Sequence, residues 1–359
     1  MEAHKTMKVS RLVVALAAMC LTSAVAQADP IADFYKDKQI QIIVRSSPGG
    51  NFDQYSRLLA AHMVRHIPGN PTTIIRYMTG GAGIQAINYV ETIAPHDGTT
   101  MTLVNNGLVM DQALGLAKGM KADLKTLNWI GNMTDSNGVM VAWHTSPVKT
   151  VEEAKKTPMH LGAAAAASAG AKFGAVANNL IGTKFNVIFG YPGNSDLNLA
   201  MERGETHGRA GGLWATVKST NPEWIAEKKI YPIIQIGLKK EPDLPDVPLL
   251  VDLAENAKDR AVLEFLSKGS VVGRPLAVAS GVPKERVAAL RRALESTMKD
   301  PAFLAEAERM KAEIGPTSGE EVQQLVADVL DAPADVRARA QQAMEWKADE
   351  TQERKSDTK

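Results

Sequence analysis

Four short segments rich in glycine, serine and asparagine carry the residue types that could bind an anion. Three of them, residues 46–53, 167–172 and 191–196, place small or turn-forming residues before a position where a helix can begin, and Asn105-Asn106-Gly107 forms the fourth. Glycine lets backbone N–H groups approach a ligand, and the first turn of a helix presents unpaired N–H groups at the positive end of its dipole. Such loops favour a carboxylate or a phosphate, although ordinary turns between strands and helices use the same residues.

The other candidate motifs support their chemistries less well. Residues 81–86 have the G-x-G-x-x-A spacing of a dinucleotide-binding turn, but two asparagines follow the next strand where an acidic residue would bind the ribose. His62 and His66 have the spacing of two metal ligands on one helix face, but two ligands alone do not make a zinc site. No serine lies in a G-x-S-x-G turn. We therefore expect no metal, no cofactor and no catalytic nucleophile.

The first 28 residues have the three parts of a secretory signal peptide. Basic residues come first, residues 12–25 are apolar or small, and Ala26-Gln27-Ala28 supplies an A-x-A cleavage site. The apolar run is too short to span a bilayer comfortably. We expect cleavage after Ala28 and export to the periplasm, so that the only cysteine, Cys20, is removed with the signal peptide.

The composition is typical of a soluble globular protein. Of 359 residues, 45% are hydrophobic and 23% are charged, and 41 basic against 40 acidic residues leave a formal net charge of +1. This length predicts two or three domains, and the balanced charge provides no binding surface for nucleic acid. Without cysteine, the mature chain would form no disulfide and would depend on a large hydrophobic core.

Short β-branched runs alternate with helical periodicity along most of the chain, which predicts βαβ units. The expected strands are residues 40–44, 72–77, 100–104, 139–143, 160–164, 185–189, 230–236 and 276–279. The expected helices include residues 84–93, 151–156, 173–181, 197–203, 283–299, 301–312, 318–330 and 335–346. Ligands of open α/β sheets bind at the carboxyl ends of the strands, where the candidate loops are expected.

Changes in this pattern divide the chain into two α/β lobes, with the second lobe inserted in the first. We expect the first lobe to comprise residues 29–135 and 242–346, and the second to comprise residues 136–241. The charged residues 347–359 lack apolar anchors and are expected to form a flexible tail. A ligand would bind between the lobes.

Several short motifs also occur in a fixed order. They are Tyr35-Lys36-Asp37-Lys38-Gln39-Ile40, Pro48-Gly49-Gly50 with Asp53 and Arg57, Gly80-Gly81-Ala82-Gly83, Pro95-His96-Asp97-Gly98-Thr99, Gly190-Tyr191-Pro192-Gly193, Arg203-Gly204-Glu205, Leu244-Pro245-Asp246-Val247-Pro248 and Gly281-Val282-Pro283. In this order, the chain resembles the periplasmic solute-binding proteins of tripartite tricarboxylate transporters, the Bug family. The resemblance covers about residues 33–346.

The resemblance implies a type II periplasmic binding protein fold, the two-lobed Venus flytrap, with a mixed sheet flanked by helices in each lobe. It also implies a monomeric, non-catalytic protein. The ligand would be a small organic carboxylate held mainly by backbone amides and bridging waters. The partner would be a permease with one large and one small membrane subunit.

The resemblance further implies which residues contact the ligand. In the first lobe they are Ser46, Ser47, Gly49, Gly50, Asp53, Asn105 and Asn106, and in the second lobe Ser168, Ala169, Gly170, Tyr191 and Gly193. Trp214 could pack against an apolar ligand body or belong to the core. Asp53 is expected to cap a helix, or to meet an ammonium or hydroxyl group of the ligand. Arg45 could add a charge-assisted contact unless strand alternation points it outward.

This chain departs from the family pattern beside the expected pocket. Arg45-Ser46-Ser47 replaces an apolar, proline-rich segment, the loop at residues 163–171 is rich in alanine, and Ala210-Gly211-Gly212 replaces a polar run. The carboxylate class is therefore expected, but the particular acid does not follow. Two alternatives stay open: a receptor that presents a carboxylate to a sensor kinase, and an exported α/β enzyme.

Overall fold

The computed structural model describes residues 29–49, 51–105, 107–164, 168–191, 194–269 and 273–353. The predicted signal peptide and the candidate site residues Gly50, Asn106 and Gly193 lie outside these ranges. Within them, no helix is both long enough and apolar enough to cross a bilayer.

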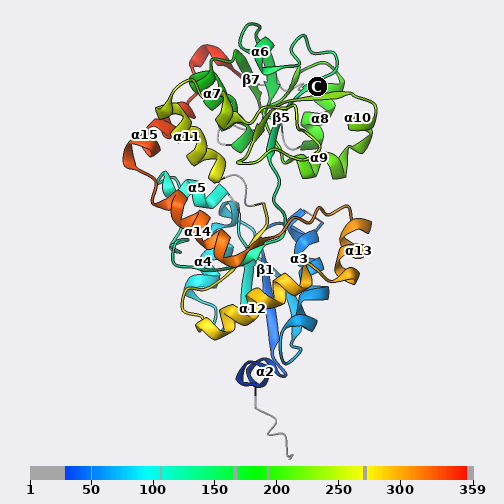
Figure 1. The fold of residues 1–359 in the computed structure, drawn as a ribbon, viewed down its shortest axis with the longest axis vertical. Coiled ribbons are helices and arrows are strands. Elements are labelled where there is room, and N and C mark those ends of the chain that lie inside the picture. The colour runs from blue at the N-terminus through cyan, green and yellow to red at the C-terminus, as the bar shows by residue number, and fades with distance from the viewer. Residues whose placement is uncertain are drawn as a thin grey trace, which may run out of the picture.

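Two six-stranded sheets form the centres of two lobes, one above the other in Figure 1. In the first sheet the strand order is β11-β4-β10-β3-β1-β2, and in the second it is β12-β7-β6-β8-β5-β9. The first sheet contains β1 (Gln39–Val44), β2 (Thr72–Tyr77), β3 (Thr100–Leu103), β4 (Asn128–Asn132), β10 (Pro275–Val278) and β11 (Thr317–Ser318). The second contains β5 (Gly138–Trp143), β6 (Met159–Gly162), β7 (Phe185–Phe189), β8 (Gly208–Arg209), β9 (Ile230–Ile236) and β12 (Thr351–Glu353).

Both sheets are mixed, as expected. Strand β1 runs parallel to β2 and β3, whereas β10 is antiparallel to β3 and β4. In the second sheet β6 is parallel to β7 and β8, and β5 is antiparallel to β8 and β9. The predicted strands 72–77, 185–189 and 230–236 have the same bounds in the structure.

Helices cover both sheets (Figure 1). Around the first sheet lie α2 (Pro30–Tyr35), α3 (Asn51–His62), α4 (Ile84–Thr92), α5 (Gly107–Ala113), α12 (Lys284–Thr297), α13 (Pro301–Arg309) and α14 (Gly319–Leu330). Around the second lie α6 (Val151–Ala154), α7 (Ala169–Ile181), α8 (Asn194–Glu202), α9 (Trp214–Thr220), α10 (Pro222–Ala226), α11 (Ala257–Lys268) and α15 (Ala334–Ala343). Short 3-10 turns occur at η1 (Met63–His66), η2 (Gly81–Gly83), η3 (Leu250–Leu253) and η4 (Ala348–Glu350).

The return to the first lobe differs from the prediction at residue 242. After β9 the chain stays with the second lobe through η3 and α11, and it rejoins the first sheet only at β10. Leu249 bridges to Gln235 of β9, and α11 packs against η3 and α15. Helix α15, predicted in the first lobe, packs against α7 and α11. These contacts place both helices with the second lobe, and α11 also contacts α14 of the first lobe.

The predicted flexible tail is also wrong for residues 347–353. Strand β12 pairs in parallel with β7 at the edge of the second sheet. The amide of Asn179 in α7 donates to the carbonyl oxygens of Ala343 and Glu345, and Trp346 packs against Gly174. An edge strand is held by backbone hydrogen bonds, so the lack of apolar anchors in this segment does not prevent it from pairing.

Truncation tests this C-terminal anchor. A chain ending at Ala343 loses Trp346 and β12, and we expect it to be less stable by roughly 3 kcal/mol. A chain ending at Glu353 keeps both and should melt with the full-length protein. Equal melting temperatures of the two truncated chains in a thermal unfolding experiment would contradict the observed packing.

Candidate functional site

Asp53 fixes the loop between β1 and α3. Its side chain is 3% exposed and accepts hydrogen bonds from the Gly49 N–H at 2.8 Å, the Arg57 Nε at 3.0 Å and the Tyr77 hydroxyl at 2.6 Å. The carboxylate thus binds the backbone of the loop that precedes the helix. Its role in this structure is to position the loop that carries Ser46, Ser47 and Gly49.

These contacts determine the pKa of Asp53. Burial acts to raise the pKa, but the hydrogen bonds from Tyr77, Gly49 and Arg57 outweigh it and hold the pKa below the ordinary value. A carboxyl whose pKa is lower in the folded protein stabilises the fold above its unfolded pKa and loses this contribution as the pH falls.

We expect Asp53→Asn to destabilise the protein by roughly 1–3 kcal/mol at neutral pH, because the substituted amide cannot accept all three hydrogen bonds. The difference in melting temperature from the unsubstituted protein should narrow as the pH falls below the ordinary Asp pKa of 3.8. Thermal unfolding across pH 7 to about pH 3 measures it. The exposed Asp246→Asn is the control and should change stability little, and an equally small effect at Asp53 would contradict this assignment.

Two arginines lie beside this loop at the carboxyl end of β1. The Arg45 guanidinium lies 3.8 Å from the centre of the Phe52 ring, and that of Arg274 lies 4.5 Å from the same ring and 5.3 Å from the Tyr55 ring. Burial, and then the charge of Arg274, lower the pKa of Arg45 to about 10, and burial lowers the pKa of Arg274. Both side chains stay protonated at neutral pH, so this edge of the first sheet is positively charged.

The loops that follow β2 and β3 converge on Arg45. A Cβ placed on Gly83 would lie 2.9 Å from the Arg45 Cδ and 3.6 Å from the Asn105 Cβ, so these three residues are in contact. Asn105 donates to the Ala82 carbonyl at 2.8 Å and accepts from the Gly107 N–H at 3.3 Å. Gly83 has φ of +105°, a conformation that favours glycine.

The second lobe contributes the start of α7. Ser168 is the N-cap of this helix and accepts a hydrogen bond from the Ala171 N–H at 3.4 Å, and Ala169 is exposed. A Cβ on Gly170 would lie 3.0 Å from the Gly211 nitrogen. The backbone at residues 168–170 therefore lies directly against the segment after β8.

Arg209 ends β8 beside this contact and was not among the predicted site residues. Its side chain is 3% exposed, and its Nη1 donates to the Asn198 Oδ1 at 2.9 Å. Burial lowers the pKa of Arg209 to about 10. Neither Arg209 nor Arg274 belongs to a motif of the sequence described above, and the sequence around them does not mark either side chain as buried.

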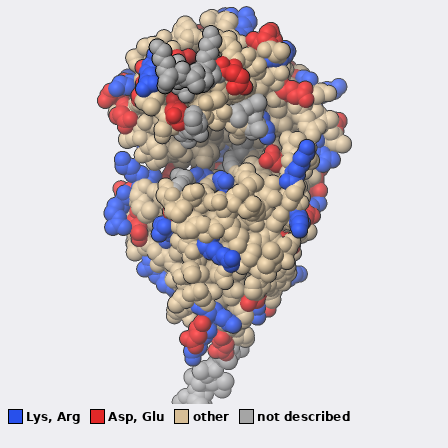
Figure 2. Space-filling model, turned by 180° about the vertical axis from the view of Figure 1, so that it is seen from behind, with Lys and Arg blue, Asp and Glu red and all other residues tan. Residues whose placement is uncertain are grey.

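A cavity of about 250 Å³ lies between the lobes, and Figure 2 shows the molecule hollowed there. From the first lobe it is lined by Ala82, Asn105, Gly107, Met110 and Asp111, and from the second lobe by Ala169, Lys172, Phe173, Val176, Leu266, Gly269 and Met344. It brings together Asn105 and Ala169, which were predicted to lie in different lobes and to contact the same ligand. The lining combines apolar side chains with a few polar groups, as small-molecule sites do.

Two candidate residues lie in cores instead of on the cleft wall. Tyr191 and Trp214 are each 2% exposed. The Tyr191 ring packs with Leu197, and Trp214 belongs to the core around Val141 and donates its indole N–H to Asp243 at 2.9 Å. Burying these large apolar rings within the second lobe stabilises the fold, and it leaves little of either ring exposed for contact with a ligand.

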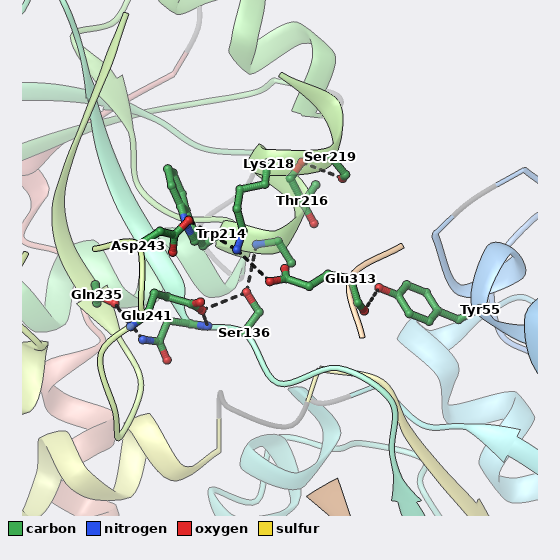
Figure 3. A network of polar contacts seen from close by, with 12 residues as sticks. Tyr55, Ser136, Trp214, Thr216, Lys218, Ser219, Gln235, Glu241, Asp243 and Glu313 are labelled. Atoms are coloured by element: carbon green, nitrogen blue, oxygen red, sulfur yellow. Dashed lines mark hydrogen bonds and ion pairs between the residues drawn. The ribbon is translucent and has the colours of Figure 1, made fainter. Parts of the chain in front are cut away.

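Polar contacts join the lobes beside the cleft (Figure 3). Lys218 of α9 lies 2.8 Å from Glu313, whose backbone carbonyl accepts a hydrogen bond from the Tyr55 hydroxyl at 2.8 Å. A second ion pair joins Lys172 and Asp111 at 3.4 Å. These contacts connect parts of the two lobes that are far apart in sequence.

The segment that connects β4 to β5 is held by Glu241. Its Oε1 accepts hydrogen bonds from the Ser136 hydroxyl at 3.2 Å and the Asn137 N–H at 2.7 Å, and Ser136 accepts one from the Ala215 N–H at 3.0 Å (Figure 3). This connection is therefore fixed to the second lobe on one side and continues into the first sheet on the other.

Comparisons with known proteins identify the architecture. No family model matches the chain, and a search of curated protein sequences finds no match. Among solved structures, a TctC solute-binding protein from Polaromonas matches at 20% identity over 86% of this chain and 99% of its own, with a TM-score of 0.68. The periplasmic binding protein BugD matches at 20% identity, covering 89% of this chain and 100% of its own, with a TM-score of 0.58.

MatC from Rhodopseudomonas palustris with bound malate matches at 17% identity, covering 86% of this chain and 99% of its own, with a TM-score of 0.57. The chain thus has the two-lobed fold of periplasmic solute-binding proteins. The expected fold class is confirmed.

Proposed function

We propose that this chain is an exported, monomeric solute-binding protein of the Bug type. It captures a small organic carboxylate between its lobes and delivers it to a tripartite tricarboxylate-type permease with one large and one small membrane subunit. One observation carries the proposal: positively charged edges and helix starts of both lobes adjoin the cavity between them. A carboxylate satisfies exposed N–H groups and guanidinium groups at once.

The comparisons support the same class of ligand and a binding role without catalysis. The fold matches that of a TctC solute-binding protein, and a further protein of this fold was solved with malate, a small organic acid. The N-terminal sequence pattern supports export, with cleavage after Ala28.

The binding mechanism is closure of one lobe on the other. A ligand that contacts both lobes stabilises the closed form by the contacts it makes only there. The ion pairs Lys218–Glu313 and Lys172–Asp111 add attraction between the lobes in the same arrangement. Closure thus converts local binding into a change of shape that a permease can recognise.

A ligand panel tests the proposed function. The mature protein, beginning at Asp29, is unfolded, refolded to remove retained ligand, and melted with aliphatic dicarboxylates and tricarboxylates, aromatic acids and acidic amino acids. An acid at 100 times its dissociation constant should add about 2.7 kcal/mol, visible as a rise in the melting temperature. The fully esterified form of the same acid is the control. If no acid raises the melting temperature, the carboxylate-binding function is excluded.

Closure predicts a smaller effect at the lobe contact. Because Lys218 and Glu313 are partly exposed, we expect Lys218→Met to weaken ligand binding only about two- to fivefold. Lys229→Met, which removes an ion pair within the second lobe, should leave the dissociation constant unchanged. Calorimetric titration of both variants measures the difference, and equal affinities would show that the Lys218 contact does not contribute to closure.

A further inference from the structure

The Arg209 guanidinium is buried without a counter-charge. Asn198 accepts from Nη1, whereas Nε and Nη2 are buried and have no hydrogen-bond partner among the described residues. No ion pair of the described residues includes Arg209, and the internal residues outside the described ranges are not acidic. A buried charge without a partner costs several kcal/mol, so a second group is needed to compensate it.

The surrounding backbone accommodates this side chain. Gly212 has φ of +146°, and a Cβ placed there would lie 2.5 Å from the Arg209 Nη2. Any other residue at position 212 would therefore need a strained backbone and would displace the guanidinium. The absence of a side chain at Gly212 thus leaves room for the guanidinium itself, which packs against this backbone.

The position of Arg209 connects it to the cleft. Arg209 is at the end of β8, and Ala210 and Gly211 follow directly and pack against Gly170 at the start of α7. Ala169, the neighbour of Gly170, lines the cavity between the lobes. The segment that carries Arg209 thus packs directly against the part of α7 that lines the cavity.

The first lobe has a similar feature at Arg45. Among the described residues, the buried Arg45 Nε has no hydrogen-bond partner and no ion pair includes this side chain. Its guanidinium is stacked on Phe52. Arg45 also adjoins Gly83 next to Asn105, which lines the cavity. In each lobe, an arginine beside the same cleft therefore has donors with no partner among the described residues.

We propose that Arg209 is a ligand-binding residue whose Nε and Nη2 donate to one anionic group of the ligand, while Arg45 donates to a second anionic group. This inference rests on the proposed function and narrows its ligand to acids with two separated carboxylates. Binding is then by direct guanidinium contact in both lobes, in place of backbone amides and waters alone.

This arrangement makes the second carboxylate important for closure. A charge-assisted hydrogen bond to a buried guanidinium is about twice as strong as a neutral one. A diacid gains such a bond in each lobe, whereas its monomethyl ester leaves one arginine uncompensated. Specificity for diacids then follows from the cost of leaving a buried charge unpaired.

Arg209→Met tests the proposal in the mature protein. Calorimetric titrations use the diacid that gives the largest shift in the ligand panel and the monomethyl ester of the same diacid. The unsubstituted protein should bind the diacid at least about tenfold more tightly than the ester, and Arg209→Met should lose about 100-fold in diacid affinity and most of this preference. Arg203→Met, an exposed arginine of the same lobe, is the matched control and should keep both.

Thermal unfolding without ligand separates a binding role from a structural one. Methionine replaces an uncompensated charge with an apolar side chain, so the ligand-free variant should be as stable as the unsubstituted protein or more stable. If Arg209→Met does not fold, Arg209→Lys, which keeps the charge but loses the planar donor fork, should bind the diacid about tenfold more weakly.

Several outcomes overturn the proposal. Unchanged diacid affinity in Arg209→Met, or in Arg209→Lys where only that variant folds, overturns it and leaves the proposed function intact. So does a protein that binds the ester as tightly as the diacid. A marked loss of ligand-free stability in Arg209→Met with undiminished preference for the diacid assigns a structural role. If the unsubstituted protein binds no acid, both proposals fail.

Discussion

The binding site depends on one constraint, the direction of the parallel strands in both sheets. The loops after β2 and β3 reach the cavity from one lobe, and the start of α7, after β6, reaches it from the other. Parallel strands place their following loops at one edge of the sheet, and each lobe presents that edge to its partner. Residues far apart in sequence, such as Asn105 and Ala169, therefore line one cavity.

Positive charge lies at these edges, in Arg45 of the first lobe and Arg209 of the second. Asp53, in the first turn of α3, accepts hydrogen bonds from Gly49, Arg57 and Tyr77, so it does not neutralise Arg45. Arg209 in the second lobe has one amide partner and no ion pair among the described residues. Both the loop geometry and the positive charge thus favour an anionic ligand. The same charges attract each lobe to a ligand that contacts both.

The sequence predicted most of the framework because the strands have strong local signals. β2, β7 and β9 are rich in β-branched or aromatic residues, and their bounds were predicted as observed. Helix α11 was missed because its apolar residues are interspersed with charged ones and follow a proline-rich stretch. Strand β12 was missed because edge pairing depends on the backbone of β7 and leaves no apolar pattern.

The sequence predicted the loops of the candidate site but not its buried charged side chains. Ser168, Ala169, Gly170 and Asn105 lie at or beside the cleft, because glycine-rich turns and helix starts are visible in sequence. The sequence does not show in the same way which side chains are buried. Trp214 could therefore not be assigned to a core, and Arg209 could not be recognised as a buried cation. Both outcomes depend on packing between segments far apart in the chain.

A crystal structure of the mature protein with its bound acid tests the account most directly. We expect a ligand between the lobes with one carboxylate oxygen within hydrogen-bond distance of the Arg209 Nε or Nη2, and a second carboxylate at Arg45. An acid bound in the cleft solely through backbone amides and water, with the Arg209 donors still unpartnered, would contradict it.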